Sequence, residues 1–465
     1  MRRILTILTM IFIAGIMYGQ DITGQWNGII KVQGMQLSLV FHITKSDSGL
    51  TSTMDSPDQK AFGIPVTSTT FENSKLKMVI ATANIEYNGE FKSDNIAGTF
   101  KQSGQEFPLN LTKGIIEKEV IIRPQEPKKP YPYYSEDVKF RNNKDSITLA
   151  GTLTLPQKEG NFPAVILITG SGPQNRDEEL MGHKPFLVLS DYLTRNGIAV
   201  LRFDDRGFGE SEGNFQTATT FDFAADVESA VEYLKTRKEI NKSKIGLAGH
   251  SEGGIIAPIV AAQMTDDIDF IVLLAGTGIR GDELLLLQQK LIYSASGVSE
   301  VDLRKILESN KKAFKLIQQS KDDKILEKEL TEFIRETIKS DSTSIPEGMT
   351  EDDLVALQVS RITNPWMLNF IRYDPATALE KVKCPVLAVN GAKDLQVPPN
   401  ENLSAIKNAL DKGGNHNVTI MLFPNLNHLF QECNTGLPDE YGGIEQTFSP
   451  IALEDITNWI VKQTK

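Results

Sequence analysis

A short motif near the middle of the chain carries residue types that can do nucleophilic chemistry. Ser251 lies at the centre of a G-x-S-x-G motif, residues 249–253, which follows the apolar run 245–248 and precedes the apolar stretch 254–262. Glycines on both sides let the backbone turn sharply from a strand into a helix, whose N-terminus favours negative charge beside the serine hydroxyl. The motif therefore predicts that Ser251 attacks a carbonyl carbon.

A serine nucleophile needs a general base and an acid that orients the base. Asp394 directly follows the apolar run 385–390, and His428 directly follows the run 419–423. Open α/β sheets gather their active-site loops at the carboxyl ends of strands, so we expect these two side chains to meet there. The other four histidines precede the acid or the last strand, which does not suit this role: His42, His183, His250 and His416.

The oxyanion that forms in such an attack needs backbone N–H donors. We expect one from Glu252, directly after the nucleophile, and one from the loop 169–173, which follows another apolar run. Glycines flank Ser171 in this loop, so the Ser171 amide is the predicted second donor. The loop lacks the third glycine of a dinucleotide-binding motif, and no phosphate-binding or zinc motif occurs in the sequence, so no cofactor and no metal are expected.

The side chain of Glu252 has two interpretations. An acid in the first turn of the nucleophile helix suits the helix dipole, which is a structural role. Alternatively, its carboxylate faces the site, where it either disfavours anionic substrates or binds the ammonium group of a substrate. The sequence leaves both open.

The second part of the chain, residues 136–465, alternates strand and helix patterns. Continuous apolar runs such as 164–169, 270–275 and 385–390 fit strands that are buried on both faces of a parallel sheet. The alternation predicts a doubly wound α/β sheet. About a hundred residues separate the last two of these runs, more than one crossover helix needs, and we expect a helical cap at about 279–380.

The first part of the chain has a different character. Residues 21–113 contain at least six short runs with period-two alternation, which predict a small antiparallel β domain, a barrel or a sandwich. A proline-rich segment, 114–135, is predicted to be an extended linker. Residues 1–20 read as a signal peptide, with two arginines before an uncharged stretch that is shorter than the roughly 20 residues of a membrane span. We therefore expect an exported protein, periplasmic or secreted, with no stable membrane span.

The overall charge excludes one class of partner. The 465 residues include 60 acidic and 49 basic side chains, a formal net charge of −11. Binding to phosphates needs clustered Lys and Arg, and no run supplies them, so no nucleic-acid partner is expected. Two cysteines exclude a disulfide scaffold. Nothing in the sequence indicates an oligomeric state.

Four motifs in residues 136–465 resemble those of α/β-hydrolases: GHSEGG around Ser251, the loop 202–211, NGAKDLQVP around Asp394 and NLNHLF around His428. This part is similar to exported bacterial carboxylesterases of the EstD type, which lie near the serine aminopeptidase group. The resemblance implies a mostly parallel eight-stranded sheet, a Ser251, His428 and Asp394 triad, an acyl-enzyme intermediate and no cofactor. It also implies structural roles for two charged residues of the loop 202–211, Asp204 and Arg206.

These observations predict a serine hydrolase that cleaves short-chain carboxylic esters of small molecules through an acyl-enzyme on Ser251. Trp366 and Phe370, in the expected cap, are predicted to line an apolar acyl pocket, although plain helix packing would also explain them. One alternative is a serine aminopeptidase that acts on small peptides. Another is a protein whose β domain binds a lipid or glycan and whose hydrolase fold is incidental.

Overall fold

The computed structural model describes residues 21–32, 35–47, 49–59, 61–102, 105–117, 122–340, 345 and 349–465. The predicted signal peptide lies outside the described residues. The chain divides into two compact units, which we call the β unit and the α/β unit. No helix among the described residues is long and apolar enough to cross a membrane.

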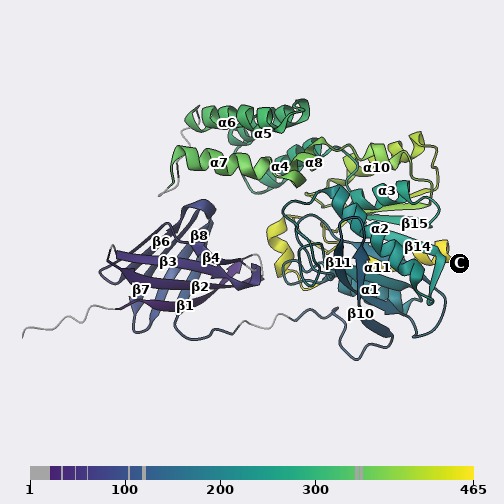
Figure 1. Cartoon of the computed structure of the whole chain (residues 1–465), viewed down its shortest axis with the longest axis horizontal. Helices are drawn as coiled ribbons and strands as arrows, with labels where there is room; N and C mark the ends of the chain where they lie inside the picture. The colour runs from purple at the N-terminus through teal and green to yellow at the C-terminus, as the bar shows by residue number, and fades with distance from the viewer. Residues whose placement is uncertain are drawn as a thin grey trace, which may run out of the picture. The chain divides into compact units, whose positions relative to one another are not determined.

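The β unit, drawn in purple and blue in Figure 1, is one antiparallel sheet of nine strands. Their order is β4-β3-β2-β1-β9-β8-β7-β6-β5. Hydroxyl Oγ1 of Thr69 in β5 donates to Ser52 Oγ in β3, at 2.9 Å, so the sheet curls until its two ends meet. The bounds are β1 (Gly24–Val32), β2 (Met35–Ser46), β3 (Gly49–Ser56), β4 (Ala61–Pro65), β5 (Ser68–Glu72), β6 (Lys75–Ile80), β7 (Ile85–Lys92), β8 (Asn95–Gln102) and β9 (Gln105–Thr112), with 3-10 turns η1 (Pro57–Gln59) and η2 (Ala81–Ala83).

Alternating side chains fill the inside of this curled sheet. Trp26, Phe41 and Tyr87 are fully buried there. The ring of Tyr87 has room because two glycines, Gly89 and Gly98, face each other on neighbouring strands. A Cβ atom on either glycine would lie 2.5 to 2.6 Å from the Tyr87 hydroxyl, so the pair must stay glycine. This confirms a small antiparallel β domain at the N-terminal side of the chain.

The α/β unit is built on an eight-stranded sheet in the order β10-β11-β13-β12-β14-β15-β16-β17. The strands from β13 to β17 in this order run parallel, while β10 and β11 are antiparallel to their neighbours. The bounds are β10 (Tyr134–Asn142), β11 (Ile147–Leu155), β12 (Phe162–Ile168), β13 (Ala199–Phe203), β14 (Ile240–His250), β15 (Phe270–Leu274), β16 (Val386–Gly391) and β17 (Val418–Phe423). The mostly parallel sheet is as predicted.

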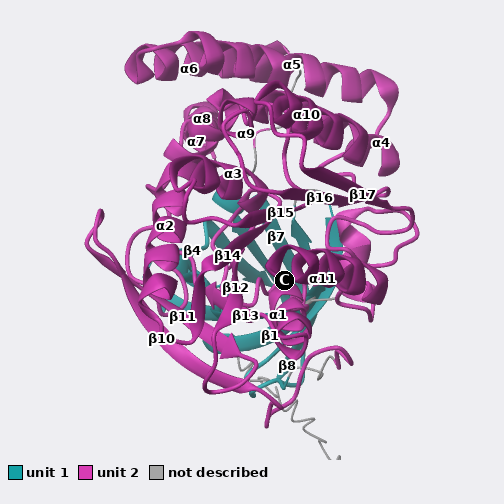
Figure 2. Cartoon of the chain, turned by 90° about the vertical axis from the view of Figure 1, so that its right-hand side faces the viewer, with its two compact units in different colours: residues 1–31, 36–118, 346–348 teal, residues 32–35, 119–345, 349–465 magenta. Residues whose placement is uncertain are grey.

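Helices cover both faces of the sheet (Figure 2). One core packs α1 (Pro185–Arg195) and α11 (Pro450–Thr464) against the sheet. The other packs α2 (Thr220–Thr236), α3 (Gly253–Gln263) and α10 (Pro399–Lys412) against the opposite face. Both faces of the central strands are therefore buried, which is why their sequences are continuous apolar runs.

A helical insertion between β15 and β16 forms the expected cap. Its helices are α4 (Gly281–Ala295), α5 (Glu300–Gln319), α6 (Asp323–Ser340), α7 (Glu351–Ile362), α8 (Pro365–Arg372) and α9 (Ala376–Leu379). Helices α5 to α8 share a small apolar core of their own, separate from the two cores of the sheet.

The proline-rich segment makes specific contacts with the α/β unit. Arg123 is buried, and its guanidinium donates hydrogen bonds to the carbonyls of Gly182, Gly442 and Ile444. The side chain of Gln125 bonds the backbone of Phe448 in both directions. These carbonyls lie on two loops, one before α1 and one around η3 (Pro438–Gly443). The segment around Arg123 is therefore part of the packing of the α/β unit.

Candidate active site

Ser251 occupies the sharp turn that the motif predicts. Strand β14 ends at His250 and helix α3 begins at Gly253, and Ser251 between them has φ 53°, in the left-handed region that few non-glycine residues adopt. A Cβ atom on Gly249 would lie 1.9 Å from the carbonyl oxygen of Gly253. The turn can be this tight only with glycine there.

The structure brings His428 and Asp394 into direct contact. Nδ1 of His428 lies 2.8 Å from Oδ2 of Asp394, and both side chains are buried. The second carboxylate oxygen of Asp394 accepts the amides of Gln396 and Val397, at 2.8 and 2.9 Å. Each residue lies on the loop that follows a parallel strand, β16 or β17. Because Asp394 takes Nδ1, the other ring nitrogen of His428, Nε2, remains for the substrate side.

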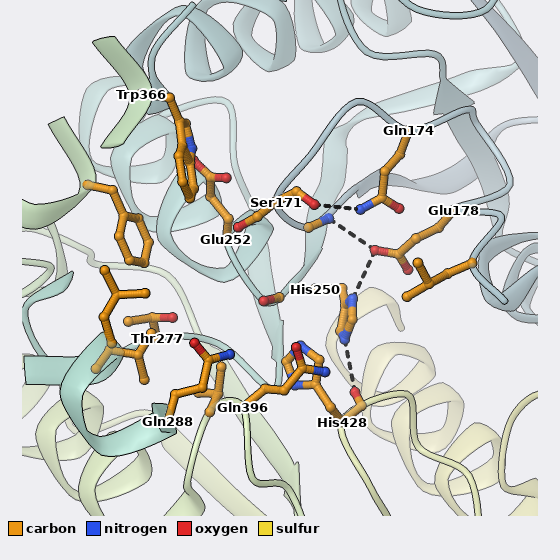
Figure 3. Close-up of a pocket in the computed structure, with 17 residues that line it drawn as sticks. Ser171, Gln174, Glu178, His250, Glu252, Thr277, Gln288, Trp366, Gln396 and His428 are labelled. Carbon is orange, nitrogen blue, oxygen red and sulfur yellow. Dashed lines mark hydrogen bonds and ion pairs between the residues drawn. The ribbon is translucent and has the colours of Figure 1, made fainter. Parts of the chain in front are cut away.

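A cavity of about 210 Å³ lies over this loop cluster (Figure 3). Six of the seven residues predicted for the site line it, and Asp394 contacts it only through His428. The six are Ser171, Ser251, Glu252, Trp366, Phe370 and His428.

Side chains from other loops bind the loop after β12 and, among the residues described, leave its Ser171 amide without an acceptor. The amide of Gly170 donates to Glu178 Oε1, at 3.0 Å. Asp205 accepts the hydroxyl of Thr169, at 2.6 Å, and the amide of Gln174, at 2.8 Å. Within the described residues, the amides of Ser171 and Glu252 have no hydrogen-bond acceptor. Both are therefore available to a substrate oxygen.

Comparison with known proteins identifies the family. A family model described as "Serine aminopeptidase, S33" matches residues 185–433, more than half of the chain. The chain belongs to this family. It is also 26% identical to Esterase EstD of Thermotoga maritima over 336 residues, which cover 71% of this chain and 70% of the esterase. The predicted resemblance to both groups is thereby confirmed.

Solved structures of esterases resemble this S33 family member in fold. An esterase of Pyrococcus furiosus is 15% identical, with a TM-score of 0.44, and the match covers 75% of this chain and 100% of that one. Est1E of Butyrivibrio proteoclasticus, with ferulic acid bound, is 18% identical, with a TM-score of 0.40 and coverage of 70% and 98%.

The carboxylate of Glu252 in this S33 family member faces the cavity. Its Oε1 accepts the hydroxyl of Thr220, at 2.7 Å, and the indole N–H of Trp366, at 2.8 Å. Burial raises the pKa of Glu252, and these two donors, together with the Ser171 hydroxyl, oppose that rise. No cation pairs with this carboxylate among the residues described.

Two aromatic residues of the S33 cap form one wall of the cavity. The rings of Trp366 and Phe370, both on α8, stack with centroids 5.1 Å apart and an angle of 19°. Leu284 and Leu285 of α4 line the cavity beside them. The bond from the Trp366 indole to Glu252 fixes the orientation of this wall.

Sequence reasoning missed two residues of the S33 site, Glu178 and His250. It set His250 aside because that residue precedes the acid, although its place next to Ser251 was a usable signal. Glu178 lies in an irregular loop, where periodicity gives no information. Asp204 and Arg206, in the loop after β13, have structural partners, as the resemblance implied: Asp204 pairs with Arg176, and Arg206 pairs with Asp226.

Proposed function

We propose that this protein is an exported serine hydrolase that cleaves short-chain carboxylic esters. The observation that carries the proposal is that Ser251 and His428 line one cavity, with His428 fixed by Asp394. Membership of a serine hydrolase family and similarity to an esterase support it.

The arrangement can perform acyl transfer in two steps. Ser251 Oγ attacks the ester carbonyl while His428 Nε2 takes the hydroxyl proton, and Asp394 stabilises the imidazolium. The amides of Ser171 and Glu252 hold the oxyanion. The tetrahedral intermediate collapses, the C–O bond to the alcohol breaks, and His428 gives its proton to the leaving alcohol. Water then attacks the acyl-enzyme by the same route and releases the carboxylic acid.

The size of the cavity supports a small acyl group. Its volume of about 210 Å³ is below the roughly 300 to 1,000 Å³ of pockets that take drug-sized ligands. The aromatic rings of Trp366 and Phe370 would contact an apolar acyl chain. We therefore expect acetate and butyrate esters to react faster than long-chain esters.

The experiment that tests this proposal compares the wild-type chain with Ser251→Ala on p-nitrophenyl esters of increasing acyl length. We expect turnover that is highest for the shortest acyl groups and is lost in the variant. Labelling by a fluorophosphonate probe separates an enzyme from a binding protein with an incidental hydrolase fold, which would not react. Turnover that persists in Ser251→Ala would refute the mechanism.

The buried carboxylate of Glu252 favours a second candidate, a small-peptide aminopeptidase. A substrate ammonium group in the cavity would pair with this carboxylate, which has no cationic partner among the described side chains. Glu252→Gln would then reduce turnover of aminoacyl arylamides and leave acyl esters less affected. Equal effects on both substrate types would reject this candidate.

Export is the remaining part of the proposal. It rests on the sequence of residues 1–20, with Arg2 and Arg3 before an uncharged stretch. N-terminal sequencing of protein made in a bacterial host tests it. We expect a mature chain that begins near Gln20, whereas a product that retains Met1 would contradict export.

A further inference from the structure

A buried acid and a buried imidazole lie directly behind the cavity. Oε1 of Glu178 is 2.8 Å from Nδ1 of His250, and the side chains are 2% and 8% exposed. Glu178 has φ 52°, in the left-handed region. A non-glycine residue keeps such a conformation only where its surroundings hold it there. The geometry of this pair is therefore imposed by the fold.

This pair connects the three loops of the site (Figure 3). Glu178 accepts the amide of Gly170, in the loop that carries Ser171. His250 directly precedes Ser251. The second nitrogen of His250, Nε2, is 2.9 Å from the carbonyl oxygen of His428. One chain of hydrogen bonds thus runs from the oxyanion loop, past the nucleophile, to the loop of the general base.

The acceptors around His250 fix where its protons lie. A carbonyl oxygen only accepts, so Nε2 carries a proton that it donates to His428. Nδ1 faces the carboxylate of Glu178, so a proton on Nδ1 makes a charge-assisted hydrogen bond to that carboxylate. Burial alone would lower the pKa of His250, but the charge of Glu178 raises that pKa above its ordinary value. Both ring nitrogens then act as donors.

We propose that Glu178 and His250 act as a positioning pair, which sets the oxyanion loop and the His428 loop at the spacing that the reaction needs. The proposal rests on the proposed function, because it concerns the same substrate carbonyl. If the pair is broken, the Ser171 amide and His428 no longer meet that carbonyl together. A misplacement of about 1 Å in such a site can reduce the rate about 100-fold.

The kinetic test uses Glu178→Gln, His250→Gln and the double variant in the full chain, with p-nitrophenyl acetate as substrate. Glutamine matches glutamate in shape and can still accept a hydrogen bond, but it carries no charge, so it no longer stabilises a buried imidazolium at His250. We expect kcat to fall at least about tenfold in each single variant, with KM within about twofold. Because the two residues act as a unit, the double variant should be no slower than the slower single variant.

Glu179→Gln is the matched control. Glu179 is the exposed neighbour of Glu178, and among the described residues its side chain bonds only the side-chain amide of Asn175. We expect wild-type kcat in this variant. Wild-type kcat in Glu178→Gln, or a double variant whose loss is the product of the two single losses, would overturn the proposal.

A spectroscopic measurement tests the pair without any substrate. In protein labelled with ¹⁵N-histidine, we expect an imidazolium signal at a pH above the ordinary histidine value of about 6.5. His250→Gln should remove this signal, and so should Glu178→Gln. A neutral His250 in the wild-type chain would overturn the proposal. An inactive wild-type chain that keeps the signal would instead contradict the proposed ester hydrolysis.

Discussion

Among the described side chains, Asp394 is the only one that makes a hydrogen bond with the imidazole of His428, at 2.8 Å to Nδ1, and the His250 ring packs against the imidazole with centroids 4.7 Å apart. Asp394 is itself fixed by two backbone amides on its other oxygen. The acid therefore acts as a rigid support that decides the tautomer and direction of the base.

Replacement of Asp394 by asparagine tests this support. The amide side chain keeps the size of the acid but favours the wrong tautomer of His428, so we expect kcat for p-nitrophenyl acetate to fall about 10⁴-fold. Asp411→Asn is the control, because Asp411 pairs with Lys407 and His416 away from the cavity. A loss of less than about tenfold in Asp394→Asn would mean that another group orients the base.

Replacement of Phe370 by leucine tests the aromatic wall. The smaller side chain enlarges the cavity, so we expect the preferred acyl chain to lengthen, measured as kcat/KM over a series of p-nitrophenyl esters. Phe314→Leu is a matched control, since Phe314 packs inside the cap core and does not line the cavity. An unchanged preference in Phe370→Leu would show that this ring only packs between helices.

The pH dependence of stability depends in part on His183. This buried imidazole bonds Thr447 and the carbonyl of Tyr441, and burial, aided by the charge of Arg123, lowers its pKa from 6.5 to about 4. Between these two values the unfolded chain binds the proton more strongly than the folded chain does. The stabilisation from a neutral His183 is therefore complete above about pH 6.5 and is lost as the pH falls toward 4.

The corresponding experiment measures urea unfolding of wild-type chain and of His183→Gln at several pH values. We expect the wild type to lose about 3 kcal/mol more than the variant between about pH 6.5 and 4. His416→Gln, at an exposed position, should behave as the wild type does. Parallel pH curves for wild type and His183→Gln would contradict the prediction.

The buried guanidinium of Arg123 predicts a role for the proline-rich segment in stability. Arg123→Ala removes the donor for three carbonyls, of which that of Gly442 is buried. A buried carbonyl left unpaired costs about 1 to 3 kcal/mol, so we expect a clear fall in the free energy of unfolding. Thermal unfolding of Lys128→Ala, an exposed position on the same segment, provides the comparison. Equal melting temperatures for the two variants would show that the segment is only a spacer.

Sequence patterns located the central strands of the α/β unit because burial on both faces makes them continuous apolar runs. In the β unit the same approach identified six strands and did not locate β3, β4 and β5. The buried face of β3 consists of Ser52, Met54 and Ser56, and β4 exposes Phe62, so neither shows the expected alternation. Small polar residues can fill the interior of a tightly curled sheet, and hydrophobicity does not reveal them.

The residues of the candidate site, too, could be predicted only where a recognisable sequence pattern places them. Ser251, Asp394 and His428 could be predicted because each directly follows a recognisable strand. Glu178 could not, since it reaches the site from an irregular loop, and only the fold places its carboxylate beside Gly170 and His250. Which side chains support a loop depends on tertiary packing that no local pattern records.

The most direct test of nucleophilic attack by Ser251 is to trap the acyl-enzyme. The wild-type chain is mixed with p-nitrophenyl acetate, quenched in acid within the first turnover and digested for mass spectrometry. We predict one acetyl group on the peptide that contains Ser251, and none in Ser251→Ala. Hydrolysis of the ester with no acetyl group on Ser251 would contradict a mechanism that proceeds through an acyl-enzyme on this serine.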